Sequence, residues 1–239
     1  MKRTVLVNYA TGRDMKNFPQ SFEDLNLSAP VLQAITELGF EKPSQIQGEA
    51  LPILLGQPTD FIGLAATGTG KTAAFALPLL ERLDPAQRSV QALVLCPTRE
   101  LAIQVAGQIE LMGRHLKIKA LPVYGGAGYG DQISGLKRGA QVVVGTPGRL
   151  VDHLSRGTLS LDGVTTVVLD EADEMISMGF KEDLTSILSA VPEAQANIWL
   201  FSATMSPEVR NVADEYLRDP ALVQVNRTEM LPANIEQLF

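Results

Sequence analysis

The chain has 239 residues, of which 45% are hydrophobic and 20% are charged, so it can bury a sizeable core within one main domain. Its single cysteine, Cys96, excludes an internal disulfide framework. The apolar stretch after Lys2 and Arg3 is too short for a signal peptide, and no stretch of the sequence is long and apolar enough to suggest a membrane span. We therefore expect a cytoplasmic protein. The net charge of −7 argues against a broad basic surface, so any nucleic acid would be held by a local patch or by backbone amides.

The first part of the chain is expected to be helical. Residues 1–20 are predicted to be a leader, to which we assign no function, and residues 21–226 the main domain. From Ser28, apolar residues at helical spacing predict an amphipathic helix. Ser44 and Gln47 form a capping-box pattern that predicts the start of a second helix.

Beyond these helices, continuous apolar runs alternate with helical stretches. The runs are residues 60–65, 91–96, 118–124, 141–145, 165–170 and 197–201. Uninterrupted apolar strands of this kind are typical of parallel sheets that helices cover on both faces. The pattern therefore predicts an α/β fold with a doubly wound, mostly parallel sheet.

The sequence AATGTGKT, residues 65–72, follows the first apolar run and is expected to open a helix. A glycine-rich turn before a helix presents backbone N–H groups to phosphate oxygens. The turn consists of Thr67, Gly68, Thr69 and Gly70. Lys71 adds an ammonium for the β and γ phosphates, and Thr72 a hydroxyl for Mg²⁺. Although Ala65 stands at the first glycine of the usual pattern, the segment predicts a nucleoside triphosphate site.

A second motif, the acidic sequence DEAD, begins at Asp170 at the end of another apolar run. Asp170 is the candidate ligand of Mg²⁺, and Glu171 the candidate general base or water-positioning group. Alone, such acids could simply complement the dipole of a helix start. Combined with the phosphate turn, they predict hydrolysis of a nucleoside triphosphate.

Polar and glycine-bearing clusters follow nearly every predicted strand. Thr98, Thr146 and Ser206 each stand where a helix N-cap is expected, the last two before a proline. Ligands of open parallel sheets bind at the carboxyl ends of the strands. We therefore expect the functional residues to share one edge of the sheet.

In chain order, the motifs GFEKPSQIQ, AATGTGKT, PTRELA, GG, TPGR, DEAD and SAT resemble the first half of the DEAD-box RNA helicases, from Phe22 to about Val225. The resemblance implies a RecA-like P-loop domain, ATP with Mg²⁺ as cofactor, and RNA as the second ligand. The stretches DEADEMISMGF and VVGTPGRLVDHLSRGTL look like the bacterial branch associated with cold shock and ribosome assembly. Ribosomal or degradation machinery would then be among the candidate partners.

The adenine base would be read by the segment before the phosphate turn. The Gln47 amide offers one donor and one acceptor, which match the N6 and N7 edge of adenine and mismatch guanine. Phe40 could stack on the ring. Without the resemblance, Gln47 would be interpreted as a helix cap and Phe40 as a core aromatic. With it, the two residues look like the family's adenine-reading motif, with Phe22 as its upstream aromatic. Gln45 stands where the family commonly has proline.

The resemblance also assigns roles to Ser202 and Thr204, which would couple hydrolysis to strand separation through hydrogen bonds toward Asp173. The simpler alternative is that Thr204 caps a turn before Ser206. Ala66 replaces a glutamine that is often present in relatives, so a side-chain contact from that position is not expected.

RNA would be held by segments that resemble the family's RNA-binding motifs, and glycine there lets the backbone approach a phosphate closely. These residues are Pro97, Thr98, Arg99, Gly125, Gly126, Thr146, Pro147, Gly148 and Arg149. Contacts to phosphates and 2′-hydroxyls would make the binding sequence-tolerant. The alternative for Arg99 and Arg149 is a surface ion pair. The run GGAGYG is a weak match to a dinucleotide fingerprint and is not adopted.

The family's ATPase needs a second RecA-like domain that supplies arginines to the γ-phosphate. Residues 227–239 are too few for another βαβ unit and resemble the start of an interdomain linker. We therefore expect this chain to be an N-terminal domain that binds nucleotide but barely turns ATP over. Two alternatives stay open: a DNA helicase of the same superfamily, and a non-catalytic RNA or protein interaction module.

Overall fold

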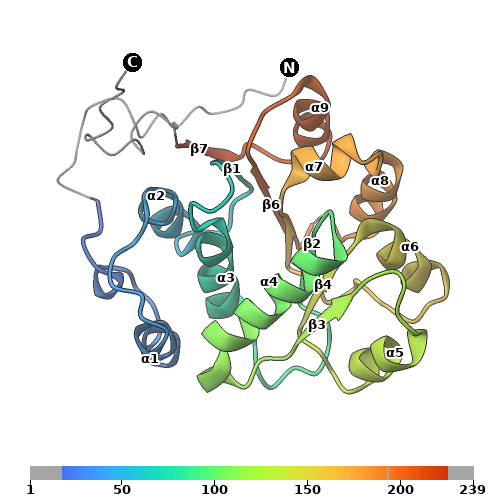
Figure 1. Cartoon of the computed structure of the whole chain (residues 1–239), viewed down its shortest axis with the longest axis horizontal. Helices are drawn as coiled ribbons and strands as arrows, with labels where there is room; N and C mark the ends of the chain where they lie inside the picture. The colour runs from blue at the N-terminus through green and yellow to red at the C-terminus, as the bar shows by residue number, and fades with distance from the viewer. Residues whose placement is uncertain (1–17, 193, 226–239) are drawn as a thin grey trace, which may run out of the picture.

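A single sheet of seven strands runs through the middle of the molecule in the computed structural model, which describes residues 18–192 and 194–225 (Figure 1). The strands are β1 (Phe61–Leu64), β2 (Ala92–Leu95), β3 (Ala120–Val123), β4 (Val142–Gly145), β5 (Thr166–Leu169), β6 (Asn197–Ser202) and β7 (Ala221–Gln224). The helices are η2 (Phe22–Asp24), α1 (Ala29–Glu37), α2 (Gln45–Leu54), α3 (Lys71–Arg82), α4 (Arg99–Met112), η3 (Arg114–Leu116), α5 (Tyr129–Lys137), α6 (Pro147–Ser155), α7 (Ala172–Ser177), α8 (Lys181–Ala190) and α9 (Pro207–Tyr216). The expected linker over 227–239, and all but the last residues of the expected leader, lie outside the described residues.

The strand order is β3-β4-β2-β5-β6-β1-β7, and every neighbouring pair is parallel. The predicted doubly wound parallel sheet is therefore confirmed, and all six predicted apolar runs form strands. Strand β7 was not predicted. Its apolar run, Ala221 to Val223, is only three residues long before Gln224, which is shorter than the runs that marked the other strands, and among the described residues it lies at the edge of the sheet beside β1.

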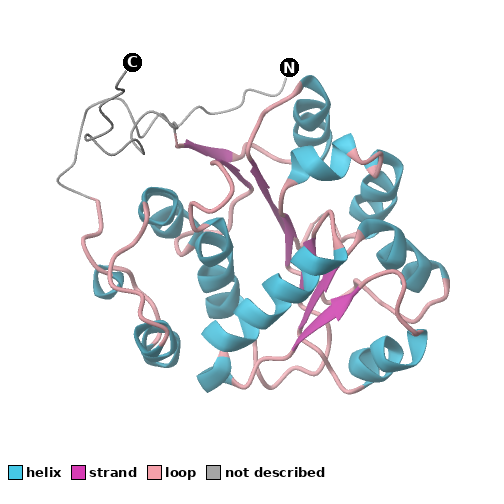
Figure 2. Ribbon diagram, viewed as in Figure 1, coloured by secondary structure: helices cyan, strands magenta, loops and turns pink. Residues whose placement is uncertain are grey.

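Side chains of the inner strands alternate between two cores. In β2, Ala92 and Val94 pack with helices α1 to α4, whereas Leu93 and Leu95 pack with α6 to α9. Figure 2 shows the strands between these two groups of helices. Because both faces are buried, the strands read as uninterrupted apolar runs.

Several helix starts follow the capping pattern expected from the sequence. Thr98 Oγ1 accepts a hydrogen bond from Leu101 N at 3.3 Å, and Ser206 Oγ accepts one from Val209 N at 3.3 Å. Thr146 stands at the N-cap of α6 without such a side-chain bond. None of the described helices combines the length and the apolar character that a membrane crossing requires.

The residues that directly follow the strands all lie at the carboxyl edge of the sheet, which we call the rim. Backbone hydrogen bonds tie adjacent strand ends together there: Asp170 N to Leu95 O at 2.9 Å, Cys96 N to Gly145 O at 2.9 Å, and Thr146 N to Val123 O at 3.0 Å. The ends of β5, β2, β4 and β3 therefore form one continuous frame.

Candidate functional site

The phosphate turn connects β1 to α3 at the rim. Gly68 and Gly70 have φ angles of +78° and +95°, which L side chains rarely adopt. A Cβ on Gly70 would also collide with the Gln47 amide. Thr69 Oγ1 donates to Ala66 O at 2.8 Å and closes the turn. Glycine at these positions thus gives the turn its shape.

Two buried charged groups at the turn and at the end of β5 each have an atom without a hydrogen-bond partner among the described residues. The side chains of Lys71 and Asp170 are 6% and 3% exposed, and neither Lys71 Nζ nor Asp170 Oδ1 has a hydrogen-bond partner among the described residues. Buried charges are normally paired, so such groups point to a missing ligand. An ammonium, a carboxylate and the Thr72 hydroxyl fit a triphosphate with Mg²⁺, which takes oxygen ligands and keeps several waters.

The environment of Asp170 shifts its ionisation. Burial raises the pKa of Asp170 to about 7, Lys71 opposes that rise, and Glu171 adds to it. A divalent cation next to the carboxylate would favour its ionised form. A cation or an ammonium group close to Asp170 would therefore lower the pKa of this carboxyl group and favour its ionised form.

Glu171 has a left-handed backbone, with φ 55° and ψ 52°, at the N-cap of α7. Such a conformation costs a non-glycine residue roughly 1–3 kcal/mol and is concentrated at functional sites. The bend carries the chain from β5 into α7 and leaves Glu171 lining the same cavity as Lys71 and Asp170.

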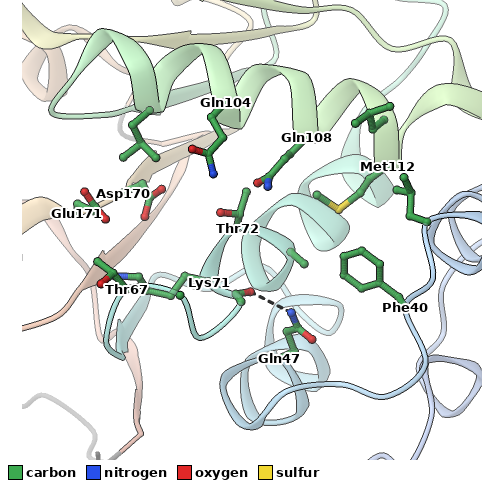
Figure 3. A pocket seen from close by; sticks show the side chains of 16 residues that line it. Phe40, Gln47, Thr67, Lys71, Thr72, Gln104, Gln108, Met112, Asp170 and Glu171 are labelled. Carbon is green, nitrogen blue, oxygen red and sulfur yellow. Dashed lines mark hydrogen bonds between the residues drawn. The ribbon is translucent and has the colours of Figure 1, made fainter.

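The cavity has a volume of about 650 Å³ and extends from these acids to Phe40. Figure 3 shows Asp170 and Glu171 at one end, Phe40 and Gln47 at the other, and Thr72 between them. Its length suits an extended ligand with an anionic end and an aromatic end. Of the predicted nucleotide residues, those that line the cavity are Phe40, Gln47, Thr67, Gly68, Gly70, Lys71, Thr72, Asp170 and Glu171.

Gln47 is fixed by two hydrogen bonds. Its Oε1 accepts from Ser44 N at 2.9 Å, which is the helix-capping role, and its Nε2 donates to Gly70 O at 3.1 Å. One lone pair and one N–H of the amide remain for a ligand. The capping and base-reading interpretations of Gln47 are therefore compatible.

Four residues that the resemblance associates with the nucleotide, Phe22, Ala66, Thr69 and Asp173, do not line this cavity. Phe22 is 3% exposed, and its ring meets that of Phe40 edge-on, with centroids 5.8 Å apart. It supports Phe40 and is not itself part of the lining, and Ala66, Thr69 and Asp173 are also outside it.

The opposite wall of the cavity comes from α4, which was not predicted to contact the nucleotide. Gln104 and Gln108 face the cavity from one side of this helix (Figure 3). Their spacing of four residues was a signal that could have identified them. Gln108 Oε1 is buried and has no partner in the described part of the chain.

The SAT segment at the end of β6 contacts the last acid of the DEAD motif. Thr204 donates to Asp173 Oδ2 through both its N–H and its Oγ1, each at 2.9 Å, so the expected hydrogen bonding toward Asp173 is present. Asp173 N in turn donates to Ser202 Oγ at 3.3 Å. Burial would raise the pKa of Asp173, but hydrogen bonds with Ser202, Thr204 and Ala203 outweigh it, and the pKa lies below its ordinary value.

The predicted RNA residues lie on three neighbouring loops of the rim, after β2, β4 and β3. The loop after β2 carries Pro97, Thr98 and Arg99, the loop after β3 carries Gly125 and Gly126, and the start of α6 carries Thr146, Pro147, Gly148 and Arg149. Gly126 has a φ of +79°, which L side chains rarely adopt, so the backbone conformation favours glycine at this position.

Both predicted RNA arginines are held by aromatic rings. The Arg99 guanidinium lies 4.9 Å from the Tyr124 ring centroid, and that of Arg149 lies 4.1 Å from the Tyr129 centroid. Arg149 also donates to Ala127 O at 3.0 Å. The ion pairs found within residues 18–192 and 194–225 do not include either arginine, so the ion-pair alternative is wrong for this structure.

Comparison with known proteins agrees with this geometry. The chain is 47% identical to the DEAD-box ATP-dependent RNA helicase CshA of Bacillus subtilis over 219 residues, which are 92% of this chain and 44% of that protein. It is also 47% identical to the ATP-dependent RNA helicase DeaD of Klebsiella pneumoniae, covering 94% of this chain and 35% of that protein. The chain thus spans less than half the length of these curated relatives.

Among solved structures, a DEAD box protein from Methanococcus jannaschii superposes with a TM-score of 0.83 at 45% identity, covering 86% of this chain and 56% of that one. The family described as DEAD/DEAH box helicase matches residues 44–212, which include the phosphate turn, the acids and the three RNA loops. With its parallel sheet, its phosphate turn and its acids all at one rim, the chain belongs to the DEAD/DEAH box helicase family.

Proposed function

We propose that this chain is the N-terminal, nucleotide-binding and RNA-binding unit of an ATP-dependent RNA helicase. The observation that carries the proposal is the pair of buried, partnerless groups, Lys71 Nζ and Asp170 Oδ1, at one end of a cavity whose other end is Phe40 and Gln47. A magnesium adenine nucleotide would satisfy both ends at once.

The residues of the cavity have separate tasks in this proposal. The turn N–H groups and Lys71 hold the phosphates, and Thr72 and Asp170 hold Mg²⁺, which supplies charge neutralisation at the phosphates when it is bound. Glu171, aimed by its left-handed backbone, orients the attacking water and accepts its proton.

RNA binds along the other half of the rim. Arg99, Arg149 and the Gly125–Gly126 turn contact phosphates and 2′-hydroxyls, so the binding tolerates many sequences. Together, the two ligands support local unwinding of RNA or remodelling of ribonucleoproteins in a complete helicase.

Two titrations test the nucleotide part. The 239-residue polypeptide should bind ADP and ATP in the presence of Mg²⁺ and should bind GDP and GTP much more weakly, because Gln47 matches adenine alone. Equal affinity for both bases would contradict the role of Gln47, and no affinity for either would contradict the site itself.

Two further measurements test the proposed RNA binding and the proposed need for a second domain in ATP hydrolysis. Single-stranded RNA should compete better than DNA of the same sequence, since the 2′-hydroxyl distinguishes them. Turnover of ATP by the polypeptide alone should be negligible, because arginines from another domain contribute roughly 10³- to 10⁵-fold in related sites. Preference for DNA would favour the alternative, a DNA helicase of the same superfamily.

A further inference from the structure

A buried glutamine, Gln132, connects two of the three loops that carry the predicted RNA contacts, those after β3 and β4. It lies in the first turn of α5, after the Gly125–Gly126 turn, and is 4% exposed. No role was predicted for it, and it is not one of the residues expected to contact RNA.

All of the polar atoms of Gln132 face groups of these loops. Its Nε2 donates to Tyr124 O at 3.0 Å and closes the segment between the end of β3 and α5. Its Oε1 accepts from Arg149 Nη1 at 3.3 Å and faces His153 Nε2 at 3.0 Å. One amide thus joins the loop after β3 to two residues of α6.

The orientation of this amide is fixed by its neighbours. Burial and the charge of Arg149 lower the pKa of His153. Arg149 Nη1 can only donate and the Tyr124 carbonyl can only accept, so the amide turns its Oε1 toward Arg149 and its Nε2 toward Tyr124. His153 Nε2, which faces Oε1, then carries a hydrogen, while Nδ1 faces the Thr158 hydroxyl at 2.8 Å. Two donors therefore meet Oε1, and a carbonyl meets Nε2.

Arg149 is consequently held from three sides. Gln132 Oε1 and Ala127 O accept from the same Nη1 atom, and the Tyr129 ring lies against the face of the guanidinium. These contacts use one of its terminal nitrogens and leave Nη2 and Nε for an anion. On the other loop, Tyr124, whose carbonyl Gln132 holds, carries Arg99 over its ring.

We propose that Gln132 is a positioning residue of the RNA site, which sets Arg149 against the Gly125–Gly126 turn so that both meet the same RNA backbone. The proposal rests on the proposed function, because it assumes that this part of the rim binds RNA. Gln132 itself does not touch RNA; it acts through Arg149 and through the carbonyl of Tyr124.

The test is a double-mutant cycle in the 239-residue chain. Gln132→Met keeps the volume and removes the amide, Arg149→Gln removes the charge, and the third variant combines them. Binding of a fluorescein-labelled oligouridylate is measured by anisotropy at several salt concentrations in the presence of ATP and Mg²⁺. Gln141→Met is the matched control, because Gln141 is equally buried at 4% exposure and also bonds through both ends of its amide, but at the opposite edge of the sheet.

We expect Gln132→Met to weaken RNA binding by about tenfold, as for one lost contact to a charged group, and to lower the salt slope by roughly 0.7, as for one lost phosphate on a single strand. The double variant should bind like Arg149→Gln alone. Gln141→Met should bind RNA like the wild type, and all variants should bind ADP normally.

Several results would overturn the proposal while leaving the proposed function intact. These are unchanged RNA binding in Gln132→Met, an equal loss in Gln141→Met, and additive losses in the double variant. A wild-type chain that binds ADP but no RNA would instead contradict the RNA part of the proposed function. If Gln132→Met does not fold, as judged by lost ADP binding, the same cycle is run with Gln132→Glu, which keeps an acceptor opposite Arg149 and should again be non-additive.

Discussion

At the proposed nucleotide end of the rim, two buried groups each have an atom without a hydrogen-bond partner among the described residues, whereas at the proposed RNA end the arginines are already held by aromatic rings. Lys71 and Asp170 form the first kind of site, and Arg149 with Gln132 and Tyr129 forms the second. The first kind costs stability until a ligand arrives, and the second kind adds stability without one. Removal of the buried charge at the first end should therefore not lower stability, whereas removal of a group that holds an arginine at the second end should.

The largest effect is expected for Lys71→Met. Loss of charged hydrogen bonds to phosphates should weaken nucleotide binding by roughly 1.5 to 3 kcal/mol, or about 10- to 150-fold. The free energy of unfolding without nucleotide should not fall, because the lost ammonium has no hydrogen-bond partner among the described residues and Asp170, whose pKa it lowers, can bind a proton in its absence. Calorimetric titration and thermal unfolding measure the two quantities, with Lys137→Met on the exposed face of α5 as the charge control. A clear loss of stability would break the comparison.

Gly70→Ala should destabilise the chain by roughly 1–3 kcal/mol, because its φ of +95° is strained for alanine and the new methyl group would meet the Gln47 amide. Nucleotide affinity should fall with it. Gly107→Ala is the matched control, because Gly107 lies within α4 with open space around it. This variant should be more stable than the wild type by about 1 kcal/mol. Denaturant unfolding distinguishes the two, and equal changes would contradict the role of the turn.

At the RNA end, Tyr129→Ala should lower the free energy of unfolding by roughly 1–2 kcal/mol. The guanidinium groups of Arg149 and Arg156 lie 4.1 and 4.3 Å from the centroid of this ring, and its hydroxyl donates to Asp152 at 2.6 Å. Tyr129→Phe removes only the hydroxyl and should cost less. If unfolding curves show no loss for either variant, the RNA end is not prearranged in the way described.

The smallest effect concerns pH. The pKa of Asp173 is lowered in the folded chain, so its contribution to stability is present above the unfolded value of about 3.9 and is lost as pH falls through the folded value. Asp173→Asn should therefore reduce stability at neutral pH and make it less sensitive to acid below about pH 4. Unfolding measured from pH 3 to pH 7 tests this, and parallel curves for the two proteins would refute it.

Much of this arrangement could be predicted because it is local in sequence. Continuous apolar runs identified the inner strands, and Thr98 and Ser206 identified helix starts, since both signals depend on neighbouring residues. The edge strand β7 was missed because its apolar run is only three residues long before Gln224.

The partners of Gln132 could not be predicted either, because His153 is brought to it by the pairing of β3 with β4 and not by any local pattern. The same holds for the α4 wall of the cavity. Gln108 meets the nucleotide cavity only because α4 packs beside α3.

The hydrogen bonds that join the strand ends have a consequence for how such a unit works with two ligands. From Asp170 to Leu95, and from Thr146 to Val123, neighbouring strand ends are hydrogen-bonded at 2.9 and 3.0 Å beside a buried core. Close-packed interiors of this kind resist sliding of one strand along another. If the two parts of the rim bind nucleotide and RNA as proposed, the distance between the two ligands would be set by the sheet, and a change in that distance would need a second body that moves relative to this unit.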